Sequence, residues 1–135
     1  MATPQTPADL KYSKTHEWAR IEGNQATIGI TEYAEDELGD VVYLELPWDD
    51  VGKLDLKAGE HFGDIESVKA TSELFAPLGG RLVRVNEALR DQPELVNSDP
   101  YGEGWMLVIE LSDPAQVSNL MDARQYEQFA QSGGH

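Results

Sequence analysis

Short runs of alternating apolar and polar residues predict β-strands in the first part of the chain. Within residues 15–30, Ala26, Ile28 and Ile30 are separated by small or polar residues, so their side chains fall on one face of an extended chain. Glu22-Gly23-Asn24 lies between two such runs and has the composition of a tight turn. The pattern therefore predicts two antiparallel strands joined by a hairpin.

The pattern changes after this hairpin, and residues 31–38 predict a short helix of about two turns. Thr31 is a favourable N-cap, and Glu32 and Glu35 occupy the first turns, where the helix dipole favours anionic side chains. Gly39 follows the last helical residue, where a glycine commonly ends a helix.

Further strand-like runs follow the predicted helix. They cover residues 41–46, 60–68, 74–85 and 105–111, and Pro77-Leu78-Gly79-Gly80 interrupts the third. In the first of them we expect Val42, Leu44 and Leu46 to share a face. The last run is mostly apolar, which is typical of a strand buried on both faces. Residues 51–58 have no clear pattern.

The remaining segments predict short helices and a long loop. Residues 86–89 predict one helical turn, and residues 91–104 predict a long loop because they are rich in Pro, Asn, Asp, Ser and Gly. Pro114 and Asp122 mark the starts of two C-terminal helices. The residues expected to share a face are Val117, Leu120 and Met121 in the first helix, and Tyr126, Phe129 and Ala130 in the second. This order of elements favours a mostly-β fold, or an α+β fold with peripheral helices.

Composition narrows the classes of partner. The chain has 135 residues, with 10 Lys and Arg against 25 Asp and Glu, so its formal net charge is −15. Phosphate backbones and anionic lipids would repel such a surface, so we expect neither nucleic acid nor a membrane as a partner. Basic patches on partner proteins would attract it. No apolar run approaches the length needed to span a bilayer.

The chain contains no cysteine, which excludes disulfides, a cysteine nucleophile and a cysteine-ligated zinc site. Thiol chemistry would therefore need a thiol that no amino-acid side chain supplies. Residues 1–9 predict a flexible Pro/Thr arm without a secretory signal pattern or any arginine. We expect the cytoplasm of a bacterium, or a mitochondrial matrix if a transit peptide has been removed.

Histidine and carboxylate residues do not form a recognisable active site. His16, His61 and His135 lack the spacing of metal-binding motifs. His16 beside Glu17 could be a base with its orienting acid, but adjacent strand residues point to opposite faces. A small acidic hydrolase that uses this pair stays open as an alternative.

Lys69 is the last of five lysines, and 66 residues follow it without another. A helix would place Glu66 and Glu73 within ion-pairing reach of it, but Val68 and Thr71 are β-branched and favour strands. The other interpretation places Lys69 at an exposed hairpin tip. The residues alone favour an ordinary surface lysine.

Motifs along almost the whole chain resemble the family of glycine cleavage system H proteins, from Leu10 to Ala130. The central match is Glu66-Ser67-Val68-Lys69-Ala70-Thr71-Ser72-Glu73. The others are Tyr12, Thr15-His16-Glu17-Trp18, Ala26-Thr27-Ile28-Gly29-Ile30-Thr31, Leu38-Gly39-Asp40-Val41-Val42, Glu45-Leu46-Pro47, Pro77, Gly80, Val85-Asn86, Pro93-Glu94-Leu95-Val96-Asn97 and Gly104-Trp105-Met106. Residues 48–56 and 73–76 match less well.

The resemblance implies a mostly-β, lipoyl-domain-like barrel-sandwich hybrid of two small antiparallel sheets, with peripheral short helices and a C-terminal helical segment. It implies one lipoyl-carrier domain over residues 10–131, between a flexible arm at 1–9 and a flexible tail at 132–135. Lys69 matches the attachment lysine and would carry lipoic acid through an amide. Biotin carriers typically place that lysine between methionines, so Val68 and Ala70 favour lipoate.

The resemblance also implies a non-catalytic, monomeric shuttle with several enzymes as partners. These are glycine decarboxylase (P protein), aminomethyltransferase (T protein), dihydrolipoyl dehydrogenase (L protein), and a lipoate ligase or lipoyl transferase. In the family the loaded arm can shelter in a surface cleft, here expected near Glu17 and residues 31–38. Three alternatives stay open. They are an H-like protein that relays lipoyl groups to other enzymes, a biotin carrier and an unmodified binding module.

Overall fold

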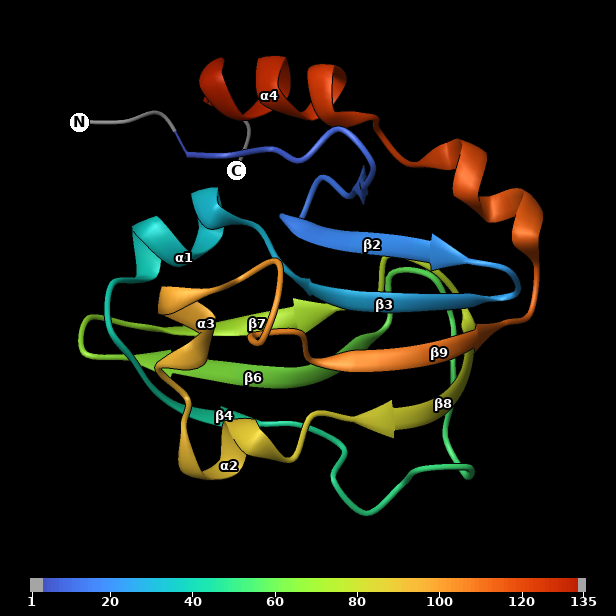
Figure 1. Cartoon of the computed structure of the whole chain (residues 1–135), viewed down its shortest axis with the longest axis horizontal. Coiled ribbons are helices and arrows are strands. Elements are labelled where there is room, and N and C mark those ends of the chain that lie inside the picture. The colour runs from blue at the N-terminus through green and yellow to red at the C-terminus, as the bar shows by residue number, and fades with distance from the viewer. Residues whose placement is uncertain (1–3, 134–135) are drawn as a thin grey trace.

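The computed structural model describes residues 4–133 and consists of two antiparallel sheets with short helices at their edges (Figure 1). In chain order the elements are β1 (Lys11–Tyr12), β2 (Glu17–Glu22), β3 (Gln25–Ile30), α1 (Glu32–Leu38), β4 (Val41–Glu45), β5 (Asp55–Leu56), β6 (His61–Ser67), β7 (Thr71–Phe75), β8 (Gly80–Val85), α2 (Ala88–Asp91), α3 (Leu95–Ser98), β9 (Leu107–Leu111), the 3₁₀-helix η1 (Pro114–Asn119) and α4 (Ala123–Gln131).

The larger sheet has six strands in the order β1-β2-β3-β9-β8-β5, and the smaller has three in the order β4-β6-β7. Every pairing within residues 4–133 is antiparallel, and these strands do not close into a barrel. The predicted mostly-β fold of two antiparallel sheets with peripheral helices is therefore confirmed.

The main core lies between the two sheets and takes apolar side chains from both. Ile28, Leu82 and Ile109 come from the larger sheet, and Leu44 and Ile65 come from the smaller one. Each is almost fully buried, and burial of one such side chain contributes about 1.5–3 kcal/mol to folding. This packing holds the smaller sheet, and therefore its β6–β7 hairpin, in a fixed orientation.

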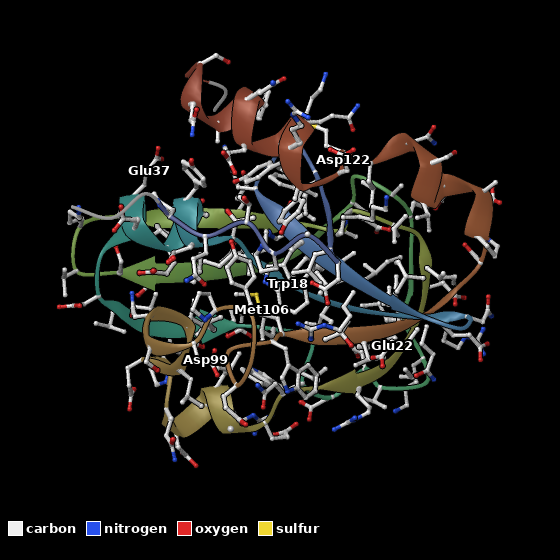
Figure 2. The ribbon with its side chains drawn as sticks, turned by 45° about the horizontal axis from the view of Figure 1, so that its top comes forward. Trp18, Glu22, Glu37, Asp99, Met106 and Asp122 are labelled. Atoms are coloured by element: carbon white, nitrogen blue, oxygen red, sulfur yellow. The ribbon has the colours of Figure 1, made fainter. Side chains whose placement is uncertain are left out.

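A second apolar cluster joins the C-terminal helix to the larger sheet. Tyr126 of α4 stacks on Tyr12 of β1 with ring centroids 4.8 Å apart, and Leu10 and Trp18 complete the buried group. Figure 2 shows Trp18 and Met106 in the interior, and neither is exposed to solvent. Helix α4 consequently covers the β1–β2 side of the molecule (Figure 1).

Residues before β1 contact this second cluster. Tyr101 donates a hydrogen bond from its hydroxyl to the Gln5 carbonyl at 2.5 Å, and Tyr12 donates to the Pro7 carbonyl at 2.6 Å. The Thr6 hydroxyl donates to the Glu127 carboxylate at 2.8 Å. The proposed boundaries of an arm, a carrier domain and a tail stay predictions.

The predicted N-terminal hairpin and helix are both present. The pairing of β2 with β3 ends at Glu22 and Gln25. Gly23, in the turn between the two strands, has φ +60°, a conformation that favours glycine. Thr31 caps α1 by accepting a hydrogen bond from the Ala34 N–H at 3.2 Å. Gly39 ends this helix, as the sequence predicts.

The predicted face of β4 is wrong at Val42. A register irregularity between Val41 and Tyr43 interrupts the pairing of β4 with β6. Such a bulge opposes two residues to one and shifts the alternation by one position. Val41 is therefore buried instead, while Val42 is 51% exposed, and only Leu44 and Leu46 keep their predicted burial.

Several short elements also differ from the sequence prediction. The expected loop at residues 91–104 contains helix α3, because Val96 is fully buried and anchors a single helical turn. Strands β1 and β5 have two residues each, too few to produce a periodic pattern. The last strand begins at Leu107 rather than at residue 105.

The first C-terminal helix is a 3₁₀-helix that ends at Asn119, so the predicted shared helical face of Val117, Leu120 and Met121 is wrong. Val117 and Leu120 pack against the core between the sheets, whereas Met121 packs in the cluster around Tyr126. Met121 also forms an isolated β-bridge with Tyr12, which turns it toward the second cluster. Within residues 4–133, no helix is long and apolar enough to cross a membrane.

Candidate functional site

Lys69 lies in the turn between β6 and β7, beyond the last paired residues of the two strands, Glu66 and Thr71. The turn is closed by a hydrogen bond from the Ser67 N–H to the Ala70 carbonyl at 2.8 Å. The Ser67 hydroxyl also accepts from the N–H groups of Lys69 and Ala70, each at 3.1 Å. The backbone of the tip is therefore ordered while the lysine side chain is exposed.

This geometry decides between the two sequence interpretations of Lys69. The residue is in a strand–turn–strand unit and not in a helix, so Glu66 and Glu73 do not flank it on a helical face. Within residues 4–133 no ion pair engages its ammonium. The amine is thus accessible to an acylating enzyme from outside the fold.

The lysine stem rests on the turn between α1 and β4. A Cβ atom at Gly39 would lie 2.9 Å from Lys69 Cε, which is closer than van der Waals contact allows. Gly39 also has φ +77°, so both its backbone and its neighbour favour glycine. The Val68 N–H donates to the Asp40 carbonyl at 3.0 Å, which ties the hairpin tip to this turn. Figure 1 shows the two turns together at one end of the molecule.

Asn97 of α3 holds the same α1–β4 turn from the other side. Its side-chain oxygen accepts from the Val41 N–H at 2.8 Å, and its amide nitrogen donates to the Gly39 carbonyl at 2.7 Å. The amide nitrogen also donates to the Glu35 carboxylate at 3.1 Å. Sequence reasoning missed this role, although the Pro93–Asn97 stretch was among the matching motifs.

A cleft of about 290 Å³ lies beside the hairpin tip. It is bounded by the hairpin, α1 and the segment before β2, with lining residues Thr15, His16, Ala34, Glu37, Leu38, Ala70, Thr71 and Ser72. Figure 2 shows Glu37 projecting from α1 at the edge of the molecule. The volume approaches the lower end of small-molecule pockets, so the cleft suits part of a flexible chain rather than a whole substrate.

Glu17, near which the cleft was expected, is only 1% exposed and is not one of its lining residues, whereas its neighbours Thr15 and His16 are. Its carboxylate accepts hydrogen bonds from the hydroxyls of Ser13 and Thr15 and from the Phe75 N–H. Burial raises the pKa of the Glu17 carboxyl to about 7, although these hydrogen bonds act in the opposite direction.

His16 has different partners from Glu17. It has φ +71°, and its Nδ1 lies 2.6 Å from the Tyr126 hydroxyl oxygen. The hydrolase alternative needs the imidazole and the Glu17 carboxylate to act as one unit, but Glu17 is engaged by Ser13, Thr15 and Phe75. The geometry does not favour that alternative.

Comparisons with known proteins agree on one family. The family described as Glycine cleavage H-protein matches residues 10–133. A glycine cleavage system H protein from Symbiobacterium thermophilum is 56% identical over 127 residues, which is 94% of this chain and 97% of the relative. One from Staphylococcus epidermidis is 54% identical over 123 residues, covering 91% and 95% of the two chains.

A solved structure supports the same relationship at the level of the fold. The crystal structure of a glycine cleavage system H protein from Mycobacterium marinum aligns with a TM-score of 0.81 and 36% sequence identity. The alignment covers 94% of this chain and 98% of that one. Sequence and fold therefore point to one family over nearly the full length.

Proposed function

The chain belongs to the glycine cleavage H-protein family, whose role is that of a lipoyl carrier in glycine cleavage, and we propose that Lys69 is its attachment residue. One observation carries the assignment to this residue. The Lys69 amine is exposed at the tip of a hairpin whose backbone is ordered by Ser67 and tied to Asp40. A lipoate ligase or lipoyl transferase can reach such an amine without unfolding the domain.

The residues around Lys69 fit the group. Amide formation between the lysine nitrogen and the lipoyl carboxyl removes one positive charge, so the formal net charge changes from −15 to −16. Among the described residues no carboxylate ion pair to Lys69 has to break first, and Gly39 leaves space for the stem. The lysine and lipoyl chain together reach on the order of 10–15 Å, estimated from bond lengths near 1.5 Å.

The bound group would supply the two thiol sulfurs that this cysteine-free chain lacks, for aminomethyl transfer from glycine decarboxylase to aminomethyltransferase and for reoxidation by dihydrolipoyl dehydrogenase. The chain itself positions the arm, since the hairpin presents Lys69 while the core holds the hairpin. Tethering gives each partner enzyme a high effective concentration of the arm. In this proposal the protein is a carrier and not a catalyst.

The cleft beside the tip would hold part of the arm between visits to the partner enzymes. Thr71 and Ser72 line it on the hairpin side, and Ala34 and Leu38 line it on α1, so it offers both polar and apolar contacts. Shelter there would keep the arm from water and from unrelated proteins. A monomeric state and the bacterial cytoplasm stay predictions.

Mass spectrometry after co-expression with lipoate ligase tests the assignment. The wild type should gain the mass of one lipoyl group on the peptide that contains Lys69, and Lys69→Arg should gain none, because arginine keeps the charge but has no acylable amine. Lys57→Arg is the matched control, since Lys57 is also exposed and should leave modification intact. Modification on another lysine, or a biotin increment, would refute the proposal.

Reconstitution separates the carrier from the H-like relay. The lipoylated protein, mixed with the other components of the system, should restore glycine-dependent release of CO₂. A protein that only relays lipoyl groups would become acylated and yet fail in this assay. An unmodified binding module would fail at the first step, because it would never acquire the group.

A further inference from the structure

A second group of polar side chains gathers on the outer face of the β6–β7 hairpin, away from the Lys69 tip. The His61 Nε2 lies 2.9 Å from an oxygen of Asp64 and 4.0 Å from an oxygen of Glu73. One nitrogen and two carboxylate oxygens from these three residues all lie within 4.8 Å of one another.

The backbone explains why these residues converge although their sequence spacing does not suggest it. Asp64 and Glu73 are direct partners in the antiparallel pairing of β6 with β7, so their side chains share a face. His61 is three residues from Asp64, which in a regular strand would place it on the opposite face. A register irregularity between His61 and Gly63 restores the same face.

We propose that His61, Asp64 and Glu73 bind a divalent transition-metal cation of the Zn²⁺ type. An imidazole nitrogen with two carboxylate oxygens is a donor set that suits such borderline cations, whereas Mg²⁺ and Ca²⁺ prefer oxygen donors alone. Ligands about 2.0–2.2 Å from a tetrahedral zinc lie about 3.3 Å apart. The two His61 separations of 2.9 and 4.0 Å bracket that value, and the three donor atoms lie within 4.8 Å of one another, so side-chain rotations have to draw the two carboxylates together to complete the site.

The surroundings favour a cation. His61 and Asp64 border a cleft of about 400 Å³ whose lining contains five carboxylates and no lysine or arginine, although Arg90 lies 3.9 Å from the lining residue Asp49. Its other acidic lining residues are Glu45, Asp49, Asp50 and Glu60. Several carboxylates around one cleft focus a negative potential that raises the local concentration of cations. The hydrogen bond to Asp64 raises the pKa of His61, and the charges of Asp64 and Glu73 act in the same direction.

The abundance of acidic residues does not by itself produce this arrangement. The chain has 25 aspartates and glutamates, yet within residues 4–133 this is the single set of three His, Asp or Glu side chains with converging ligand atoms. The three side chains are 45%, 42% and 66% exposed, so water can complete the coordination. A bound cation would cross-link β6 to β7 and stabilise the hairpin that carries Lys69.

Titration of the unlipoylated protein with ZnCl₂ at about pH 8 tests the proposal, because the imidazole must be neutral to bind. The unlipoylated form contains no sulfur donor from a cofactor, and a His135→Ala background removes the imidazole of the C-terminus. Calorimetry should show one saturable equivalent, and NMR should show the His61 ring resonances shifting first. Zinc should also raise the melting temperature.

Two variants and one matched control decide the outcome. His61→Gln should weaken zinc binding at least tenfold and Glu73→Gln severalfold, and both should abolish the rise in melting temperature. Glu22→Gln removes an exposed carboxylate of β2 and should bind zinc as the wild type does. Each variant's melting temperature in EDTA checks that it folds.

Three results would overturn the metal site. They are the absence of saturable binding, equal affinity in His61→Gln, and equal shifts of the His61 resonances by MgCl₂ at the same concentration. The last result would identify a diffuse counterion effect of the acidic face. None of these results bears on acylation of Lys69, so the two proposals can fail separately.

Discussion

Glu17 of β2 accepts a hydrogen bond from the Phe75 N–H of β7 at 3.1 Å, and this contact joins the edge of the smaller sheet to the larger one. Strand β7 is the outer strand of its sheet and leads directly from the Lys69 turn. A single buried carboxylate therefore helps to set the position of the hairpin relative to the main body of the protein.

The first prediction concerns the pH dependence of stability. Burial raises the pKa of Glu17 to about 7 in the folded state from 4.5. The folded state then binds more protons than the unfolded state between these values, so the free energy of unfolding falls as pH rises through 7. The Glu17 contribution is fully present below about pH 4.5, and its loss by pH 8 amounts to at most about 3 kcal/mol.

Glu17→Gln tests this, because glutamine keeps an acceptor for the Phe75 N–H without a titratable proton. Denaturant unfolding measured from pH 5 to 8 should show a flatter profile for Glu17→Gln than for the wild type. Glu22→Gln on the same strand is exposed and should keep the wild-type slope. Equal slopes in Glu17→Gln and the wild type would contradict the assignment to this carboxyl.

The second prediction separates two effects of Gly39. Gly39→Ala should destabilise the protein by about 1 kcal/mol, because φ +77° is unfavourable for alanine, and should displace the Lys69 stem. Gly23→Ala is the matched control, since Gly23 has φ +60° but nothing within 4 Å of a Cβ atom. Only Gly39→Ala should shift the Lys69 side-chain resonances; similar shifts in both variants would count against the contact.

The third prediction concerns Asn97. Asn97→Ala removes three hydrogen bonds that hold the α1–β4 turn, and should lower the free energy of unfolding by about 2–3 kcal/mol. Amide hydrogen exchange at Val41 and Val68 should accelerate more than exchange in β3. Asn24→Ala removes a single long hydrogen bond and should have a much smaller effect. Unchanged exchange at Val41 would show that the turn does not depend on Asn97.

The fourth prediction concerns the rate at which partner enzymes bind. A net charge of −15 should steer association toward basic surfaces, so association rates should fall as salt is added, while dissociation rates change little. Stopped-flow binding at several ionic strengths measures both rates. Association rates that do not respond to salt would show that the acidic surface takes no part in the encounter.

The sequence correctly predicted the elements whose signals are local. The β2–β3 hairpin has alternating residues around Gly23, and α1 has Thr31 at its start and Gly39 at its end. These signals act within a few residues, so the local amino-acid sequence is sufficient to locate the elements. The proposal of Lys69 as the attachment residue rests on its surrounding motif, whereas spacing and composition alone favour an ordinary surface lysine.

Tertiary structure decided the features that depend on contacts between distant residues. Irregular pairing of β4 with β6 exposes Val42, and irregular pairing of β6 with β7 brings His61 to the face of Glu73. Burial of Val96 stabilises the single turn of α3. Register and burial are set by neighbouring strands and helices, whose positions no local pattern encodes. The chain alone therefore determined its β2–β3 hairpin, the caps of α1 and its acidic character, while packing between distant segments decided which side chains meet.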